Sequence, residues 1–180
     1  MKKWMPVLFT ITILPALAQA ELPLGKMPVN VVLSGDDGGY VDGRGAFDSA
    51  ELIGKLNTIF YVDPDEKDLN NKASEALKGD QVLVKAREEG KSASYAIINM
   101  AATWLPNAVL TGLIEDSQKE HPNTHYVFDM NEVLHKKWGI ATDSSDVIVI
   151  NKEGNVVFSK DGELSDADIQ TLLKTIHENL

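Results

Sequence analysis

The chain of 180 residues contains no cysteine. This absence excludes disulfide bonds, thiol catalysis, disulfide exchange and thiolate metal sites together. Basic residues are also scarce, because 17 Lys and Arg stand against 27 Asp and Glu and give a formal net charge of −10. A nucleic-acid-binding protein needs a basic face to neutralise phosphates, and a protein that docks on anionic lipid needs one as well. The charge therefore argues against both classes.

The sequence also lacks an apolar run of the roughly 20 residues that span a membrane comfortably. The longest apolar stretch runs from Met5 to Leu17, follows two lysines and is followed by Ala18 and Ala20. A basic start, a short apolar segment and small residues in this order are typical of a secretory signal peptide. We expect residues 1–20 to be removed, so that Glu21 becomes the N-terminus of a periplasmic protein with no stable membrane insertion. An uncleaved membrane anchor is the alternative.

Residues 21–180 have the length and composition of one domain. Leu56–Val62 mixes β-branched and aromatic residues as a central strand does. Asp63 and Pro64 come next and suit the cap and first position of a helix, and Glu66 lies where a capping box has an acid. We expect Asp63 and Glu66 to cap a helix with a buried stripe.

The rest of the chain alternates between strand and helix patterns. Val29–Leu33 and Tyr40–Val41 predict an N-terminal β-hairpin, whereas the polar segment Lys78–Ser94 predicts a loop or a surface segment. Further strands are expected at 95–99, 125–129, 146–151 and 156–159, and further helices from 106, at 133–138 and from 165. This order predicts an α/β fold with a thioredoxin-like mixed sheet flanked by helices.

Several segments of the sequence resemble known protein families. Gly54-Lys55 before the central strand and the segment 138–158 resemble thioredoxin-like and peroxiredoxin-related proteins. More closely, the chain resembles the YtfJ family of exported bacterial proteins, in the segments Ala50–Lys55, Tyr126–Asp129, Ser144–Val149 and Lys160–Leu164. The resemblance implies a thioredoxin-like fold and a periplasmic location, but no reaction.

The resemblance also shows where a redox site would lie. Thioredoxin-like enzymes hold a reactive cysteine at the start of the helix after the first central strand, where free N–H groups stabilise a thiolate. The matching stretch here carries acids instead, and the position of the second hallmark, a cis-proline, is held by serines. The vacated redox-site positions are Asp63, Asp65, Glu66, Asp68, Ser144 and Ser145. This excludes a thiol oxidoreductase or peroxidase, and we expect a trans peptide at Ser145.

Two sets of residues could suggest a metal, and we expect neither to bind one. Three acids lie in the Gly-rich segment 35–45, but they lack the spacing of a calcium loop and suit turns: Asp36, Asp37 and Asp42. Three histidines fall close together but lack the short spacing of a zinc pair: His121, His125 and His135. The same glycines have no following Lys-Ser/Thr, which argues against a P-loop.

The sequence favours a binding or accessory protein without catalytic residues, cofactor or metal, whose partner is an unknown protein or small molecule. Trp104 lies in a loop before Pro106 and is a possible partner contact, although burial under the following helix is the alternative. Trp138 is expected in the core. A hydrolase or metal-dependent enzyme is the rival hypothesis, with residues Asp63, Glu66, His125 and Ser145. A chaperone-like or stress protein with no fixed ligand is a third.

Overall fold

The computed structural model describes residues 22–141 and 144–180. The expected cleavage site, with Ala18, Ala20 and Glu21, therefore lies outside the described residues. Within them, none of the helices has the length and apolar character needed to cross a membrane.

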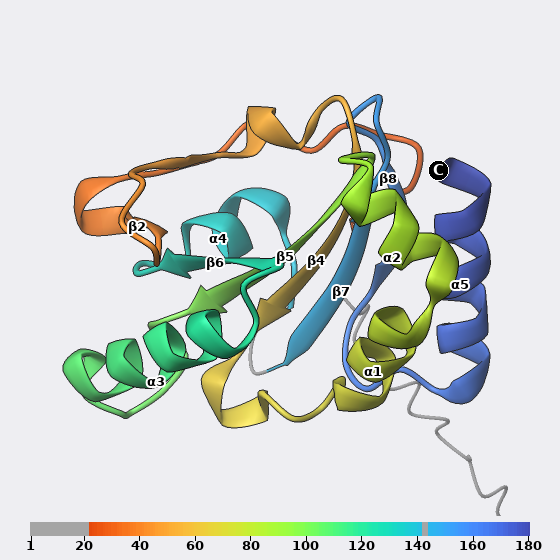
Figure 1. The fold of residues 1–180 in the computed structure, drawn as a ribbon. Helices are drawn as coiled ribbons and strands as arrows, with labels where there is room; N and C mark the ends of the chain where they lie inside the picture. Colours follow the sequence, from red (N-terminus) through yellow and green to blue (C-terminus); the bar gives the residue numbers. More distant parts are fainter. Residues whose placement is uncertain (1–21, 142–143) are drawn as a thin grey trace, which may run out of the picture.

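A mixed sheet of six strands organises the described part of the chain, with the order β2-β6-β5-β4-β7-β8 (Figure 1). β4, β5 and β6 are parallel to one another, whereas β7 is antiparallel to β4 and β8 is antiparallel to β7. The strands are β2 (Gly38–Tyr40), β4 (Leu56–Val62), β5 (Ser92–Asn99), β6 (Thr124–Asp129), β7 (Ser145–Ile150) and β8 (Val156–Lys160). The predicted central strand, the C-terminal hairpin and the mixed sheet are confirmed.

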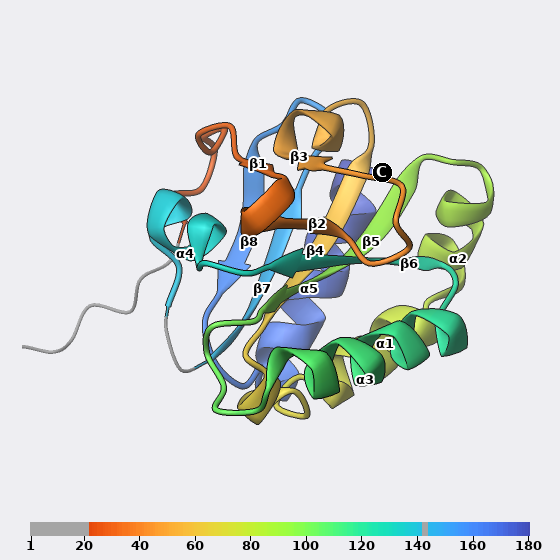
Figure 2. The ribbon, with the colours of Figure 1, turned by 90° about the vertical axis from the view of Figure 1, so that its left-hand side faces the viewer.

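Helices cover both faces of this sheet (Figures 1 and 2). One face carries α1, α2, α3 and α5, and the other carries α4 together with the N-terminal segment that includes β1 and β3. The helices are α1 (Asn71–Gly79), α2 (Gln81–Glu88), α3 (Asn107–Glu120), α4 (Val133–Trp138) and α5 (Asp166–Asn179). Ser165 and Asp168 form the expected capping box of α5.

The core is continuous on one face of the sheet and divided on the other. Under α4, alternate residues of β4 such as Ile59 and Tyr61 pack in one cluster with Trp138. On the opposite face, one cluster joins α1, α2 and α5 to β7, and a separate cluster joins α3 to Ile98 of β5. Because these two clusters do not merge, the sheet between α1 and α3 is left partly open.

The N-terminal strands do not form the predicted hairpin. β1 (Val32–Leu33) pairs with β3 (Phe47–Asp48), whereas β2 joins the main sheet beside β6. The reason lies in Gly38, which has φ 118° and approaches β6 so closely that a Cβ there would lie 2.0 Å from the carbonyl oxygen of Phe128. A glycine is needed for this approach, so Gly38 permits the pairing of β2 with β6.

The prediction of a loop over Lys78–Ser94 is wrong, because this segment contains α2 and the start of β5. Asp80 caps α2, since its Oδ1 accepts a hydrogen bond of 2.8 Å from Leu83 N. Leu83 and Ala86 are the buried residues of this helix. Because only two of its eight residues are buried, the sequence of α2 is mostly polar and shows no clear helical spacing of apolar residues.

Candidate functional site

The residues predicted to be vacated redox-site positions lie at the carboxyl end of β4. Asp63 is buried directly after the strand and caps the 3₁₀ turn Pro64–Glu66, because its Oδ1 accepts a hydrogen bond of 2.9 Å from Asp65 N. The main chains also join across this end, since Asp63 N donates to Ser144 O at 3.3 Å. No peptide bond among the described residues is cis, so the peptide at Ser145 is trans as expected.

The hydrogen bonds of Ser145 and Asp65 hold this end of the sheet together. Ser145 Oγ donates to the carbonyl oxygen of Glu66 at 3.1 Å, and Asp65 Oδ1 accepts from Thr103 Oγ1 at 2.8 Å. The serine hydroxyl is thus engaged with the main chain and is not directed at a base. Thr103 ties the loop that carries Trp104 to the 3₁₀ turn.

The predicted helix start differs from the structure in two ways. The α-helix begins only at Asn71, and Glu66 is exposed and makes no capping bond in the part of the chain that the structure describes. Asp68 is also exposed and pairs with Lys67 Nζ at 2.8 Å. The hydrogen bond from Lys67 lowers the pKa of Asp68, with Asn71 and the charge of Lys67 as further causes. Asp63 is therefore a cap as expected, but of the 3₁₀ turn and not of the α-helix, and the prediction that Glu66 is a capping residue is wrong.

The structure keeps His125 apart from the other residues of the rival enzyme hypothesis, which lie together at the end of β4. Ser145 lies opposite Val62 on β4, whereas His125 lies opposite Tyr95, which in turn lies opposite Ile59. Three residues along a strand span about 10 Å, and two strand spacings separate β6 from β4 in addition. Ser145 and His125 therefore cannot form a nucleophile–base pair.

His125 instead belongs to an aromatic cluster near the start of β6. Its Nδ1 accepts a hydrogen bond of 2.8 Å from Arg44 Nη2, and its ring lies 5.0 Å from that of Tyr95. Burial lowers the pKa of His125, and the nearby charge of Arg44 lowers it further. Arg44 also covers the ring of Tyr40, whose hydroxyl donates to Glu51 Oε1 at 2.6 Å.

Within residues 22–141 and 144–180, no group of three or more His, Asp or Glu is arranged to hold a metal ion. His135 lies on α4, on the far face of the sheet from the α3 end where His121 lies. Asp37 accepts a hydrogen bond from Asn131 Nδ2, and Asp42 pairs with Arg44 at 3.4 Å. Asp42 thus stabilises a local turn, whereas Asp37 joins the Gly-rich segment to the residues after β6.

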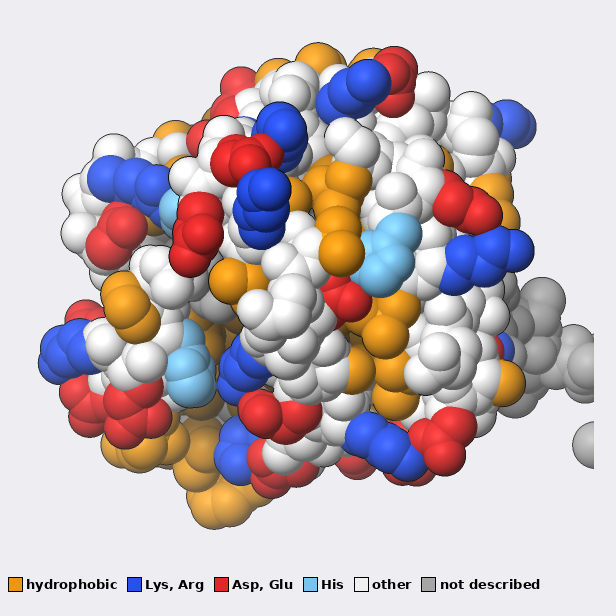
Figure 3. Space-filling model, turned by 45° about the vertical axis from the view of Figure 1, so that its right-hand side comes forward, with side chains coloured by type: hydrophobic (Ala, Val, Ile, Leu, Met, Phe, Trp, Pro, Cys, Tyr) orange, Lys and Arg blue, Asp and Glu red, His pale blue; other side chains and the backbone are white. Residues whose placement is uncertain are grey.

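A groove of about 620 Å³ lies between α1 and α3, across β4, β5 and β6. Its floor is made largely of apolar side chains, among them Phe60, Ala96 and Ile98. In Figure 3 a hollow lined with hydrophobic side chains opens at the left of the molecule, with charged side chains of both signs along its margins. This is the space left between the two separate clusters of the core.

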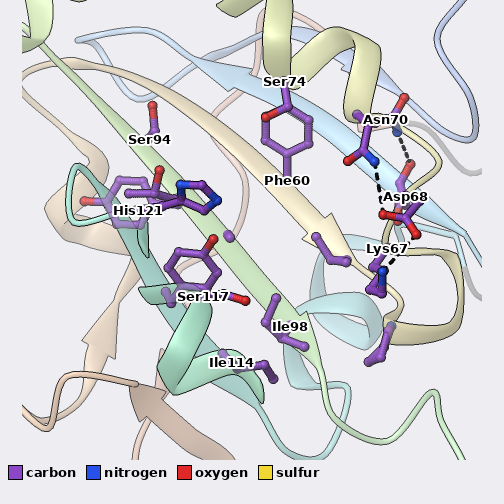
Figure 4. A pocket seen from close by; sticks show the side chains of 18 of the residues that line it. Phe60, Lys67, Asp68, Asn70, Ser74, Ser94, Ile98, Ile114, Ser117 and His121 are labelled. Atoms are coloured by element: carbon purple, nitrogen blue, oxygen red, sulfur yellow. Dashed lines mark hydrogen bonds and ion pairs between the residues drawn. The ribbon is translucent and has the colours of Figure 1, made fainter. Parts of the chain in front are cut away.

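The two ends of the groove differ in chemistry (Figure 4). Ser94 and His121 lie together at one end, whereas Lys67 and Asp68 lie at the other. Phe60, Ile98 and Ile114 occupy the stretch between them. The vacated redox-site positions border the second end, since Pro64 and Ser145 also line the groove.

Exposed apolar side chains extend the groove at its α3 side. Leu105 and Leu113 line it, and Leu113 remains 57% exposed. Trp104 is 84% exposed, so the alternative that it is buried under α3 does not hold. Trp138 is buried as expected, and its Nε1 donates to Val29 O at 2.9 Å. The sequence identified Trp104 and the acids after β4, but it gave no sign of the groove.

Comparison with known proteins places the chain beside bacterial proteins without an assigned activity. A family model described as "Bacterial protein of unknown function (YtfJ_HI0045)" matches residues 31–179. An uncharacterized protein of Haemophilus influenzae is 28% identical over 156 residues, which cover 82% of this chain and 77% of that protein. The uncharacterized protein YtfJ of Escherichia coli is 24% identical over 138 residues, covering 74% of this chain and 72% of that one.

Solved structures similar to this one have a thioredoxin-like fold. A presumed protein disulfide isomerase from Bacteroides thetaiotaomicron has a TM-score of 0.65 and 15% identity, over 91% of this chain and 94% of that one. A thiol-disulfide isomerase from Corynebacterium glutamicum has a TM-score of 0.56 and 13% identity, over 86% and 96%. The predicted thioredoxin-like fold is confirmed, in a chain that contains no cysteine.

Proposed function

The chain belongs to the YtfJ_HI0045 family of bacterial proteins of unknown function, and we propose that it is an exported protein that binds a ligand in the groove between α1 and α3. The observation that carries the proposal is the groove itself. Its volume of about 620 Å³ lies within the range of small-molecule sites, and its floor is mostly apolar with a few polar groups at the ends.

The chemistry around the groove supports binding in preference to catalysis. A thioredoxin-like enzyme would present a thiolate at the position of the 3₁₀ turn Pro64–Glu66, where this chain has a buried Asp63. The carboxylate of Asp63 accepts a hydrogen bond from Asp65 N, an N–H group that could otherwise stabilise a bound anion. With Ser145 Oγ bonded to Glu66 O, the residues that border the groove serve to hold its shape.

Trp104 extends the proposed site. It lies beside Leu105, which lines the groove, and its side chain is almost fully in solvent. Exposed tryptophans are enriched where proteins bind partners, because the ring buries a large apolar area at a low cost in conformational entropy. We include Trp104 in the site as a contact at the mouth of the groove.

Export is a separate part of the proposal and rests on the N-terminal sequence. Intact-mass measurement of the protein recovered from periplasmic extract tests it directly. The proposal predicts a chain that begins at Glu21. A mass that retains residues 1–20 would show that the segment is an anchor.

Binding of Nile red, an uncharged apolar dye, tests the groove. We expect saturable binding to the mature protein, weakened about tenfold by Leu113→Gln, because this change places an amide at the margin of the apolar floor. Val109→Gln is the matched control. Val109 lies one turn earlier on α3 and is 53% exposed, but it does not line the groove.

The two variants separate groove binding from general surface hydrophobicity. Equal affinity of both variants and the unchanged protein would mean that the dye binds elsewhere, and absence of saturable binding would overturn the proposal. Thermal melts of both variants check that neither is unfolded. Both residues are exposed, so melting temperatures should change little.

A further inference from the structure

We propose that the groove takes a single-chain anionic amphiphile, a free fatty acid, with its carboxylate at Arg87 and its chain along β5. The inference rests on the proposed function, since it names the ligand of the same groove. It follows from the order of polar and apolar side chains along the floor and from the position of one arginine.

The floor changes character along the strands. Alternate residues of β4, β5 and β6 face α1 and α3, and the strand register sets them in rows across the sheet. The first row that crosses all three strands carries hydroxyl groups, on Thr58, Ser94 and Thr124, of which Ser94 and Thr124 line the groove. The next two rows are apolar apart from one phenol hydroxyl, and all of their residues except Phe128 line the groove: Phe60, Ala96, Tyr126, Val62, Ile98 and Phe128. A ligand that matches this floor is polar at one end and apolar along the rest.

Arg87 supplies a positive charge at the polar end. It lies on α2, is half-buried, and lines the groove with Ser94 and His121. One Nη donates to Leu77 O at 3.0 Å, and no carboxylate lies within 4.0 Å of the guanidinium in the described part of the chain. A half-buried arginine without an ion pair is suited to a carboxylate, which it can bind through two parallel hydrogen bonds.

The other charges of the groove are compatible with this assignment. Lys78 lines the same end and pairs with Glu75 at 2.9 Å, whereas Lys67 and Asp68 pair with each other at the opposite end. Glu120 is the remaining acid of the lining, is exposed, and opposes an anion near Arg87. Asp80, the N-cap of α2, also acts on Arg87 through its charge, but it pairs with His177 at 2.9 Å and does not line the groove. The charges at the polar end are therefore those of Arg87 against Glu120 and the more distant Asp80.

An acyl chain fits the floor better than a peptide does. The main-chain groups of β4 and β5 are paired within the sheet, and at the start of β6 Thr124 O and Tyr126 N bond to the side chain of Gln118, so the floor offers a ligand only side chains. A peptide would place its amides against apolar side chains with few partners, at a large cost in desolvation. An acyl chain carries no such groups, and a groove of about 620 Å³ suits one chain in preference to a two-chain lipid.

Calorimetric titration with three ten-carbon ligands tests the inference on the unaltered mature protein. Decanoate, 1-decanol and decyltrimethylammonium share the chain and differ in the charge of the head. We expect decanoate to bind about tenfold more tightly than decanol, because a half-buried charged hydrogen bond adds to the burial of the chain. The cation should bind most weakly.

Variants test whether Arg87 is the residue that binds the carboxylate of decanoate. Arg87→Gln should weaken decanoate about tenfold and leave decanol unchanged, whereas Glu120→Gln should strengthen decanoate. Lys85→Gln is the matched control, since Lys85 lies on the same helix, is exposed and does not line the groove. It should bind all three ligands as the unaltered protein does.

The outcomes separate this inference from the proposed function. If Nile red binds in the groove but decanoate and decanol have equal affinity, the head assignment is overturned and the groove remains a binding site. If decanoate does not bind at all while an apolar peptide does, the ligand class is wrong. A dimer in sedimentation that is insensitive to decanoate and is lost in Leu113→Gln would assign the groove to a second copy, which also overturns the inference.

Discussion

Asp63 has a structural role at the end of β4. Its side chain caps the turn after β4 through Asp65 N. Replacing Asp63 by Ala should lower the free energy of unfolding by at least about 1 kcal/mol, the usual size of a lost cap. Glu66→Ala should stay within about 0.5 kcal/mol, because Glu66 is exposed. Urea melts measure both, and equal effects of the two changes would contradict the assignment of the cap to Asp63.

His125 predicts a pH dependence of stability. Arginine can only donate hydrogen bonds, so the bond from Arg44 requires an unprotonated Nδ1, in agreement with a pKa that burial lowers from 6.5. Between the lowered pKa and 6.5, the folded protein binds fewer protons than the unfolded chain. Acidification through this window therefore destabilises the fold, and stability returns as the pH rises.

Replacing His125 by Gln tests that account, because Gln keeps an acceptor but does not titrate. We expect the free energy of unfolding of His125→Gln to depend less on pH than that of the unaltered protein, between about pH 7 and about pH 5. Urea melts at several pH values give the two curves. If the two proteins showed the same dependence of unfolding free energy on pH, the pKa of His125 would not be lowered in the folded state.

The residue before helix α4 has an uncommon conformation. Glu132 has φ 56°, a left-handed value that costs a non-glycine residue about 1–2 kcal/mol. Glu132→Gly should raise the free energy of unfolding by up to about 1 kcal/mol, since glycine relieves this cost but is more flexible in the unfolded chain. Glu132→Ala is the control, because it keeps the strain and also removes the ion pair with Lys136. A glycine variant no more stable than the alanine variant would contradict this explanation.

Elements with a strong local pattern were predictable from the sequence. The run Val147–Ile150 is apolar at each position because β7 is buried on both faces, and Ser165 with Asp168 marks the start of α5. Helix α2 was missed because only Leu83 and Ala86 are buried in it. The pairing of β2 depends on the close approach of Gly38 to β6, which no local pattern shows.

Some parts of the candidate site could likewise be predicted from the sequence, and others could not. The acids after β4 could be located because they follow a recognisable strand, and Trp104 could be singled out as a residue type that binds partners. The groove could not be predicted, since it exists only because α1 and α3 pack in separate clusters. Phe60 and Ala96 are ordinary strand residues in the sequence, and Arg87 lies in a segment expected to be a loop.

For the molecule as a whole, stability should not depend on redox state or metal. The chain has no cysteine, and the described residues contain no group arranged to hold a metal ion. We expect melting temperatures to agree within about a degree with and without dithiothreitol or EDTA. A decrease of several degrees with EDTA would show a bound metal, because a metal that binds only the folded state must stabilise it.

The central claim is that the face between α1 and α3 is where this protein binds its ligand. Two-dimensional NMR of the ¹⁵N-labelled mature protein during titration with decanoate tests it most directly, because each amide reports its own surroundings. The account predicts that the largest shifts follow the groove, at Ala96 and Ile98 of β5, Leu113 of α3 and Arg87 of α2. Shifts confined to α4 and the N-terminal strands, on the opposite face of the sheet, would contradict it.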